Sequence, residues 1–490
     1  MAVPPTSPHN PRKAYVETYG CQMNISDSEL MEGVLAASGF AVARTPDEAD
    51  VILVNTCAIR EHAEQRVLGR VGELNRLKGD RPDLVIGVTG CMAQRMGERL
   101  LDRAGHVDLV MGPDSYRKLP EVLRAVRPTL SEGQAQVGRS GSGRGGHRLP
   151  VLQTSSPQAI GCSAEHGGSR AAVLELEAHE NYEGLEVRRT SSVGAWVPVQ
   201  RGCNYRCTYC IVPYVRGAEK NRSPERVLEE VRGIVAQGIP EVTLLGQTVN
   251  SYADGDWDFA RLLKAVAGVD GISRVRFTSP HPNDVTPALI EVMAAEEVVC
   301  KHLHLPVQAG HDRTLKRMVR RYTVDRFMAV VGSLRQAMPD IALSTDVIVA
   351  FPGETDEEYQ ATLELMRAVR FDDAFTYKYS LREGTPASRL PASDFVPEPV
   401  GQARLEALIR VQREIQAEIN RSEVGRVEEV LVERVARSHG DVLGRTGRNK
   451  VVAFPGDPSL IGSFVEVRLD RTTGATFVGS RAEADEARVA

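Results

Sequence analysis

The chain has 490 residues, enough for about three domains of roughly 150 residues each. Its 60 basic and 65 acidic side chains leave a formal net charge of −5, so any contact with a nucleic acid must come from local basic patches. The N-terminal residues lack an apolar signal-peptide core, and no run approaches the roughly 18 apolar residues of a membrane span. We therefore expect a cytoplasmic protein without a membrane segment, in which thiols stay reduced.

Over the first hundred residues, three apolar runs each lead into a cysteine. The runs are AYVETYG, DVILVNTC and DLVIGVTGC, and helices are predicted between them over 26–37 and 61–78. Ser26 and Glu29 form a capping-box pattern at the start of the first helix. Alternating strands and helices indicate a parallel sheet, whose carboxyl ends share one edge. Cys21, Cys57 and Cys91 should therefore converge at that edge of an N-terminal domain spanning 12–128.

Residues 129–180 break this pattern with a Gly- and Ser-rich stretch that includes SEGQAQVGRSGSGRGGHR. Almost no apolar periodicity is left there, which indicates a flexible insert or linker. Cys162 lies inside it with only His166 nearby, and we interpret this thiol as a solvent-exposed bystander.

A second alternating series spans 190–420. Its strand candidates are AWVPVQ, EVTLLG, RVRFTS, KHLHLP, ALSTDVIV and AFTYKYS. Six strand-helix units predict a partial barrel of parallel strands, with the active site on loops at their carboxyl ends. The first strand leads to Cys203, Cys207 and Cys210. The other strand ends carry polar groups, which predict a pocket: Gln247, Ser279 with His281, Gln308, Asp346 with Glu354, and Lys378.

Residues 423–485 change to short β runs, EEVLVERV, VVAF and SFVEVRL, separated by turn signals. This pattern predicts a small β-barrel. Arg445, Arg448 and Lys450 in GRTGRNK would suit phosphate contacts, and a solvated basic turn explains them equally well.

The spacing Cys-x-x-x-Cys-x-x-Cys also raises the possibility of a zinc site. A structural zinc site usually has four protein ligands, and no fourth cysteine or histidine lies nearby in the sequence; His281 or His304 could complete one only through the fold. Three thiolates instead suit a four-iron cluster with one iron left open, and the upstream cysteines form a second such set. The pattern favours two iron-sulfur clusters over zinc.

At this point the chain resembles a known family. GCNYRCTYC with the barrel pattern resembles the radical S-adenosylmethionine superfamily, and the upstream cysteines narrow the resemblance to the methylthiotransferases. The C-terminal module is similar to the RNA-binding TRAM domain. TYGCQMNISDSE, CTYCIVPYVRG, LLGQTVNSY and HLHLPVQAGHDRTLKRM resemble the tRNA branch that modifies N6-dimethylallyladenosine. Gln22 and Met23 replace the Pro-Lys pair of the ribosomal-protein branch and the Lys-Val pair of the threonylcarbamoyl-adenosine branch. Departures from the favoured branch include Thr248, Ala309 and Asn221.

The resemblance implies a transferase that replaces the C2 hydrogen of the adenine by a methylthio group, a C–H bond that only radical chemistry can open. The cluster on Cys203, Cys207 and Cys210 would bind S-adenosylmethionine and cleave it reductively to the radical that abstracts this hydrogen. The second [4Fe-4S] cluster would hold the sulfur, and a second S-adenosylmethionine would supply the methyl group.

Four polar residues at the strand ends are candidates for contacts with S-adenosylmethionine: Gln247, His304, Gln308 and Asp346. Each of them has an alternative interpretation, in which it satisfies a neighbouring backbone group.

The tRNA would be held as an anticodon stem-loop with one base splayed out. Arg117, Lys118, Arg124 and Arg127 would assist the TRAM-like module, although a solvated helix face is the simpler account of them. A reducing electron donor and a sulfur or cluster supply system are further expected partners, and a monomer is expected. Three alternatives remain: a methylthiotransferase for threonylcarbamoyl-adenosine, one for a ribosomal-protein aspartate, and a non-catalytic iron-sulfur redox sensor that binds RNA.

Overall fold

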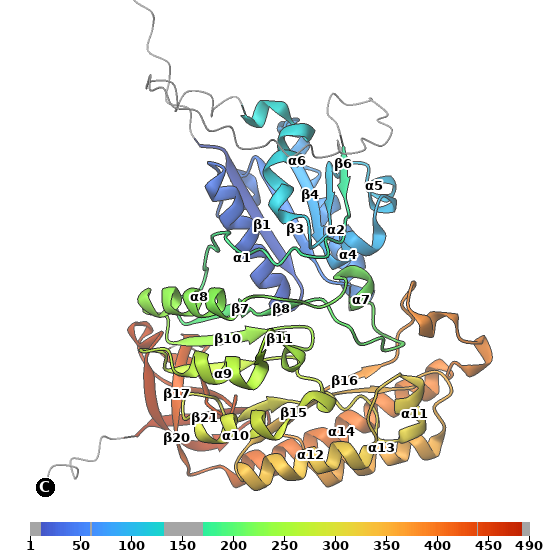
Figure 1. Cartoon of the computed structure of the whole chain (residues 1–490), viewed down its shortest axis with the longest axis vertical. Coiled ribbons are helices and arrows are strands. Elements are labelled where there is room, and N and C mark those ends of the chain that lie inside the picture. The colour runs from blue at the N-terminus through green and yellow to red at the C-terminus, as the bar shows by residue number, and fades with distance from the viewer. Residues whose placement is uncertain (1–10, 59–60, 132–169, 439, 483–490) are drawn as a thin grey trace, which may run out of the picture. The chain divides into compact units, whose positions relative to one another are not determined.

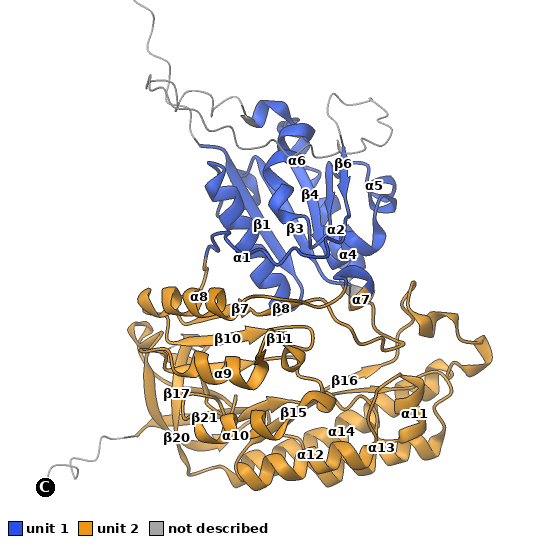
Figure 2. Cartoon of the chain, viewed as in Figure 1, with its two compact units in different colours: residues 1–188, 214–217 blue, residues 189–213, 218–490 orange. Residues whose placement is uncertain are grey.

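The computed structural model describes residues 11–58, 61–131, 170–438 and 440–482, and the predicted bystander Cys162 lies outside these ranges. The chain divides into two compact units (Figure 2). Unit 1 comprises Met1–Arg188 and Tyr214–Gly217, and unit 2 comprises Arg189–Pro213 and Ala218–Ala490. None of the helices in the described ranges has the length and apolar character that crossing a bilayer requires.

Unit 1 is built on a six-stranded parallel sheet (Figure 1). Its strands, in the spatial order β2-β1-β3-β4-β5-β6, are β1 (Lys13–Tyr19), β2 (Ala41–Val42), β3 (Val51–Thr56), β4 (Val85–Gly90), β5 (Leu109–Met111) and β6 (Ala171–Val173). The predicted parallel sheet is confirmed, although only three of its strands were recognised in the sequence. β6 falls within the predicted insert, so the predicted end of that insert at residue 180 is too late.

Helices cover both faces of this sheet. The helix α1 (Gln22–Ala37) and the helix α6 (Leu119–Val126) pack in one apolar core, and α2 (Glu61–Leu74), α4 (Cys91–Met96) and α5 (Arg99–Arg103) pack in the other. All residues of β3 and β4 are buried. Burial on both faces explains why these strands read as continuous apolar runs rather than alternating ones.

Two helix boundaries differ from the sequence prediction. The helix α1 begins at Gln22, with Cys21 as its N-cap and Asn24 completing the capping box, so Ser26 and Glu29 lie buried inside it. The predicted helix 61–78 is interrupted, and α3 (Leu77–Asp80) follows α2 as a separate turn. The pattern Ser-x-x-Glu caps a helix only where the helix begins. Here the end of β1 determines that α1 begins at Gln22, before Ser26.

Unit 2 contains the predicted partial barrel, formed by two parallel three-stranded sheets. One is ordered β13-β10-β7 and the other β14-β15-β16: β7 (Gly194–Pro198), β10 (Glu241–Leu245), β13 (Arg274–Phe277), β14 (His302–His304), β15 (Ala342–Val349) and β16 (Asp373–Lys378). A parallel bridge between Val275 and Val299 connects the two sheets. All six strand candidates are confirmed.

Helices follow the barrel strands and pack on one continuous apolar core. They are α8 (Pro224–Ala236), α9 (Phe259–Ala267), α10 (Pro287–Ala295), α11 (Asp312–Arg317), α12 (Val324–Ala337), α13 (Asp356–Val369) and α14 (Glu398–Ser422). Their starts are set by capping side chains, such as the Ser223 hydroxyl, which accepts from the Arg226 N–H, and Thr355, which forms a capping box with Glu358. Two short ladders complete the loops: β8 (Gln200–Arg201) with β9 (Lys220–Asn221), and β11 (Ala253–Asp254) with β12 (Trp257–Asp258).

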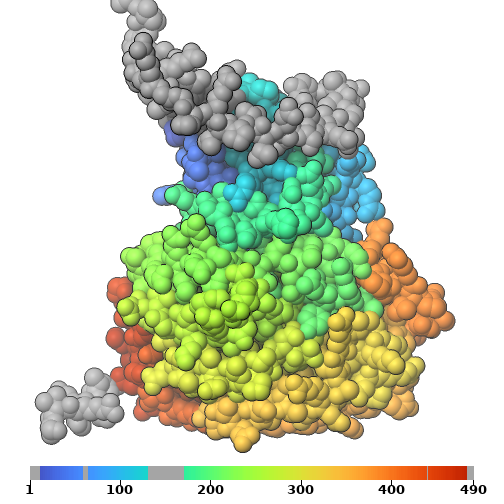
Figure 3. Space-filling model, viewed as in Figure 1, coloured from blue at the N-terminus to red at the C-terminus, as the bar shows by residue number. Residues whose placement is uncertain are grey.

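The C-terminal segment of unit 2 is a closed five-stranded barrel, as predicted. Its strands are β17 (Val427–Val435), β18 (Asp441–Thr446), β19 (Val451–Pro455), β20 (Phe464–Thr472) and β21 (Thr476–Arg481). The short strands β18 and β21 were not recognised in the sequence. Closure removes free strand edges from this small module. In the space-filling view its red atoms lie directly against the green and yellow atoms of the larger barrel (Figure 3).

Candidate functional site

The upstream cysteines meet at one edge of the unit 1 sheet. Tyr19 at the end of β1 pairs with Thr56 of β3, and Thr56 pairs with Gly90 of β4. Cys57 and Cys91 directly follow Thr56 and Gly90, and Cys21 lies two residues beyond Tyr19. The register of the parallel sheet therefore brings Cys21, Cys57 and Cys91 together, as the alternating pattern predicted.

Glycines precede two of these cysteines because the backbone passes close to buried amides. Gly90 has a φ of +91°, and a Cβ there would lie 2.5 Å from Asn55 Oδ1. At Gly20, a Cβ would lie 2.3 Å from Asn24 Oδ1. Any side chain at either position would displace an amide that supports the cysteine loops.

Those amides form a buried network below the cysteines. The Asn24 side chain donates to Asn55 Oδ1 at 3.1 Å and to the Thr56 carbonyl at 3.2 Å, and its Oδ1 accepts the Cys21 N–H at 3.3 Å. Asn55 Nδ2 donates back to the Asn24 carbonyl at 2.8 Å and to Ser28 Oγ at 2.9 Å. The network fixes the loops after β1 and β3 relative to each other.

Arg216 is the charged group of this site, and the sequence analysis did not identify it. Its Nε donates to Cys91 Sγ at 3.2 Å, and its Nη2 donates to Asp27 Oδ2 at 2.7 Å. Both charged side chains are buried. No spacing rule connects Arg216 with Cys91 in the sequence, because the contact exists only through the fold.

Without a bound group, the thiols of this set differ in acidity. A hydrogen bond with Cys57 lowers the pKa of Cys21 to about 6, against the effect of burial and with help from the Arg216 charge. Burial raises the pKa of Cys91, although Arg216 acts in the opposite direction. Coordination to iron would deprotonate all three thiols.

The downstream cysteines lie on one loop that follows β8. Cys203 Sγ lies 3.1 Å from Thr248 Oγ1, and Arg320 Nη1 donates to Cys207 Sγ at 3.5 Å. The Thr208 N–H donates to the Met318 carbonyl, which anchors the loop between the second and third cysteines. Burial raises the pKa of the Cys210 thiol to about 12, so this ligand needs a cationic partner to ionise. Thr248, which departs from the family pattern, is thus in contact with a cysteine of this set.

A buried aromatic stack borders the downstream loop. The Tyr205 ring stacks on His281 with 3.9 Å between ring centroids, and the Tyr205 hydroxyl donates to Asp284 Oδ2 at 2.7 Å. His281 Nδ1 accepts the Asn283 N–H at 3.2 Å, which places the proton of a neutral ring on Nε2. Burial, with the charges of Arg320 and Arg321, lowers the pKa of His281 to about 2.

His281 should therefore make the protein less stable in mild acid. Below pH 6.5, the ordinary pKa of histidine, this ring is protonated in the unfolded chain but stays neutral in the folded protein. The free energy of unfolding therefore decreases as the pH drops. Between pH 6.5 and 4.5 this amounts to about 2 to 3 kcal/mol for one group. We expect His281→Phe, which keeps a ring on Tyr205, to lose less stability over this interval than the wild type in urea unfolding. Parallel pH profiles would contradict the assignment.

Three family models match the chain: the Radical SAM superfamily over residues 197–366, the TRAM domain over 421–479, and the Uncharacterized protein family UPF0004 over 13–112. A tRNA-2-methylthio-N(6)-dimethylallyladenosine synthase from Carboxydothermus hydrogenoformans is 42% identical over 469 residues, which cover 94% of this chain and 97% of that protein. A protein of the same name from Pelotomaculum thermopropionicum is 43% identical over 470 residues, with 95% and 96% covered. The chain belongs to this synthase family.

Members of the synthase family are methylthiotransferases of the radical S-adenosylmethionine type, so the chain is a transferase that uses [4Fe-4S] clusters and S-adenosylmethionine. A solved structure of TsrM from Kitasatospora setae, a radical S-adenosylmethionine methyltransferase, has a TM-score of 0.52 at 17% identity and covers 77% of each chain. That likeness shows the fold alone.

Both cysteine sets fit a cluster better than a single metal ion. Within the described ranges, no three His, Cys, Asp or Glu side chains are grouped so that they could hold one ion. In a four-iron cluster each thiolate binds a different iron, so wider spacing is required. Both sets also carry a hydrogen-bond donor beside a sulfur, Arg216 at Cys91 and Arg320 at Cys207, as expected around anionic ligands.

Of the four proposed S-adenosylmethionine contacts, His304 ends β14, and Gln308 and Gln247 follow β14 and β10, whereas Asp346 lies inside β15 rather than at the predicted strand end. His304 Nε2 lies 3.3 Å from Asp346 Oδ2, and its Nδ1 lies 3.0 Å from Ser344 Oγ. Gln308 has a φ of +71°, and its N–H donates to the Asp346 carbonyl. The structure thus brings His304, Gln308 and Asp346 together.

Gln247 follows β10 in the other sheet of the barrel. Its Oε1 is buried and has no hydrogen-bond partner among the described residues, which leaves one acceptor for a bound molecule.

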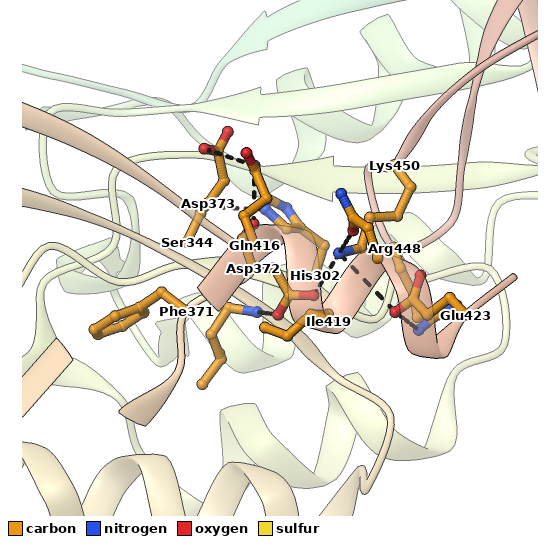
Figure 4. Close-up of polar contacts among 12 residues, drawn as sticks. His302, Ser344, Phe371, Asp372, Asp373, Gln416, Ile419, Glu423, Arg448 and Lys450 are labelled. Carbon is orange, nitrogen blue, oxygen red and sulfur yellow. Dashed lines mark hydrogen bonds and ion pairs between the residues drawn. The ribbon is translucent and has the colours of Figure 1, made fainter. Parts of the chain in front are cut away.

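Two of the three cations proposed for RNA lie in internal ion pairs (Figure 4). Lys450 Nζ contacts Asp372 Oδ1 at 2.6 Å and Asn420 Oδ1 at 3.0 Å. Arg448 pairs with Glu423 at 2.8 Å and with Glu428 at 2.5 Å. Both side chains are nearly buried, so they attach the small barrel to α14 and to the start of β16. Their charges are not free for phosphate.

Arg445 differs from these two cations. It lies in β18 rather than in a loop, its side chain is 37% exposed, and it pairs with Glu433. Of the three, Arg445 remains the best placed for a phosphate contact.

Lys450→Met should destabilise unit 2, because it leaves the Asp372 carboxylate, whose side chain is only 15% exposed, without its cation. Removing one partner of a buried pair typically costs about 3 to 5 kcal/mol, whereas an exposed pair contributes about 0 to 1 kcal/mol. Arg445→Met is the matched control in urea unfolding. Loss of Arg445 should instead reduce the salt dependence of tRNA binding by about one phosphate contact. Equal stability losses in the two variants would contradict this division of roles.

Arg117 and Lys118, in the turn directly before α6, are also paired. Arg117 forms ion pairs with Glu180, and Lys118 with Glu175 and Glu177. These contacts hold the chain after β6 against the turn before α6, within unit 1.

Proposed function

We propose that the protein converts N6-dimethylallyladenosine in tRNA to its 2-methylthio derivative. The proposal rests on two separate three-cysteine sites in one chain. The relatives of this chain are named for the same activity. One site lies at the edge of the unit 1 sheet and the other on the first loop of the barrel. A single electron-transfer or structural cluster would need only one such set.

The groups that these sites would hold supply a substrate radical, a sulfur atom and a methyl group. The residues of the chain orient the cysteines and bind S-adenosylmethionine. Thr248 and Arg320 orient Cys203 and Cys207 through contacts to their sulfurs. The cluster of His304, Gln308 and Asp346 presents polar atoms at the end of β14 and on the neighbouring β15, where the amino acid and ribose parts of S-adenosylmethionine would bind.

The tRNA would be bound through its anticodon stem-loop with the target base turned out of the stack, since its C2 edge is otherwise covered. The C-terminal barrel, with Arg445 on β18, supports phosphate binding. We further propose a cytoplasmic monomer that depends on a reducing electron donor and on a sulfur or cluster supply system.

The test is mass spectrometry of nucleosides from tRNA that carries dimethylallyladenosine, after anaerobic incubation with the cluster-loaded protein, S-adenosylmethionine and a reductant. The expected result is a methylthio increment on that nucleoside. Transfer RNA without the dimethylallyl group is the matched control and should show none. If 5′-deoxyadenosine forms without the increment, the substrate is instead threonylcarbamoyl-adenosine or a ribosomal-protein aspartate. If neither forms, the redox-sensor alternative gains support.

A further inference from the structure

Arg216 lies six residues after Cys210 in the sequence, and it belongs to the short segment that is part of unit 1 (Figure 2). Its side chain is 4% exposed, and its guanidinium contacts Cys91 Sγ and the carboxylate of Asp27. Cys91 precedes the predicted insert in the sequence, and Arg216, which donates to its sulfur, follows that insert. The family resemblance assigns no role to this arginine.

The third nitrogen of this guanidinium, Nη1, is also buried. It has no hydrogen-bond partner in the part of the chain that the structure describes. A buried donor without a partner is costly, and more so when it is charged. The other two nitrogens point to Cys91 Sγ and Asp27, which fixes the planar group in place. Nη1 is therefore available to an acceptor beside the cysteines.

The charges around Arg216 also indicate that it acts on the cysteine site. Asp27 carries one negative charge against the one positive charge of Arg216, and the neighbouring Tyr116 is a buried phenol. Three thiolates with a cluster add further negative charge at the same place. Hydrogen bonds and positive charge near cluster sulfurs favour the reduced state of a cluster, because they stabilise the added electron.

We propose that Arg216 is a positioning residue of the upstream cluster site, which holds the Cys91 sulfur through Nε, offers Nη1 to a second sulfur and raises the reduction potential there. The inference rests on the assignment of a cluster to Cys21, Cys57 and Cys91, and it is independent of which nucleoside is modified.

The test uses the full-length chain with Cys203, Cys207 and Cys210 replaced by alanine, so that only the upstream set can bind a cluster. The reconstituted protein is titrated anaerobically with dithionite, and the reduced cluster is followed by electron paramagnetic resonance. Arg216→Gln removes the charge and shortens the donor. We expect at least a tenfold shift of the one-electron equilibrium toward the oxidised cluster, which is about 59 mV in potential.

Asp27→Asn should shift the reduction potential of the upstream cluster in the opposite direction. It keeps Arg216 and its bond to Cys91 but removes the compensating negative charge, so the potential should rise. General loosening of the site would move both variants in the same direction. Arg81→Gln is the matched control, because Arg81 donates to the Ala49 and Pro46 carbonyls at the opposite edge of the sheet and should leave the potential unchanged.

Loss of one partner of a buried pair can prevent folding, and an apolar replacement of both partners is usually tolerated. The double variant Arg216→Met with Asp27→Leu therefore provides a folded protein without the donor, and its potential should also fall. An unchanged potential in the variants that lack Arg216, with full iron content, would overturn the proposal. So would a fall of the potential in Asp27→Asn.

Discussion

Replacement of Cys207 by alanine should reduce the formation of 5′-deoxyadenosine from S-adenosylmethionine to the background of a reaction without protein. Two cysteines remain on the loop, and a four-iron cluster held by two thiolates would not keep one defined open iron. The residue is buried and accepts a hydrogen bond from Arg320, so its loss also leaves that guanidinium without a sulfur partner. Chromatography of the reaction mixture with mass detection measures the product directly.

Cys300→Ala is the matched control for this variant. Cys300 is also a buried free cysteine of unit 2, and it lies before β14, at the end of the barrel away from the cysteine loop. Its replacement should leave product formation within about twofold, because a buried Cys behaves as a small apolar side chain. Cleavage of S-adenosylmethionine that persists in Cys207→Ala would overturn the assignment of the downstream cluster.

Replacement of Cys57 by alanine should separate the two halves of the reaction. The downstream loop is untouched, so 5′-deoxyadenosine should still form at a rate within severalfold of the wild type. The methylthio nucleoside should fall below detection, because the upstream set has lost a ligand at the end of β3. Iron content should drop from about eight to about four per chain if each set holds one four-iron cluster.

The same samples provide the internal control. The intact protein is alkylated before the cluster is removed and is then digested with trypsin. Cys203, Cys207 and Cys210 should be found unalkylated in the tryptic peptides, both for Cys57→Ala and for the wild type. A variant that still makes methylthio nucleoside would show that the upstream set does not hold the sulfur. A variant that loses both products would show that the two sites are interdependent.

The sequence by itself determined the chemistry-bearing residues and the fold class. Cys57 and Cys91 directly follow the buried strands β3 and β4, and Cys21 lies two residues beyond β1; parallel strands end at one edge, so the convergence followed from pattern alone. The downstream cysteines lie within eight residues of one another and needed no tertiary information. The six barrel strands were recognisable because each is long enough, or apolar enough, to show its period.

Only the tertiary structure decided which charged groups face these sites and which are used for packing. Arg448 and Lys450 looked like a basic loop, yet Glu423, directly after α14, and Asp372, directly before β16, neutralise them. Arg216 had no role in the sequence analysis beyond its place in CTYCIVPYVRG, and the structure buries it between Asp27 and Cys91. Long-range ion pairs join residues whose separation in the chain carries no signal, whereas strand and helix periods are local. The structure therefore identified the partners of the charged side chains, and the sequence identified the cysteines that we propose as cluster ligands.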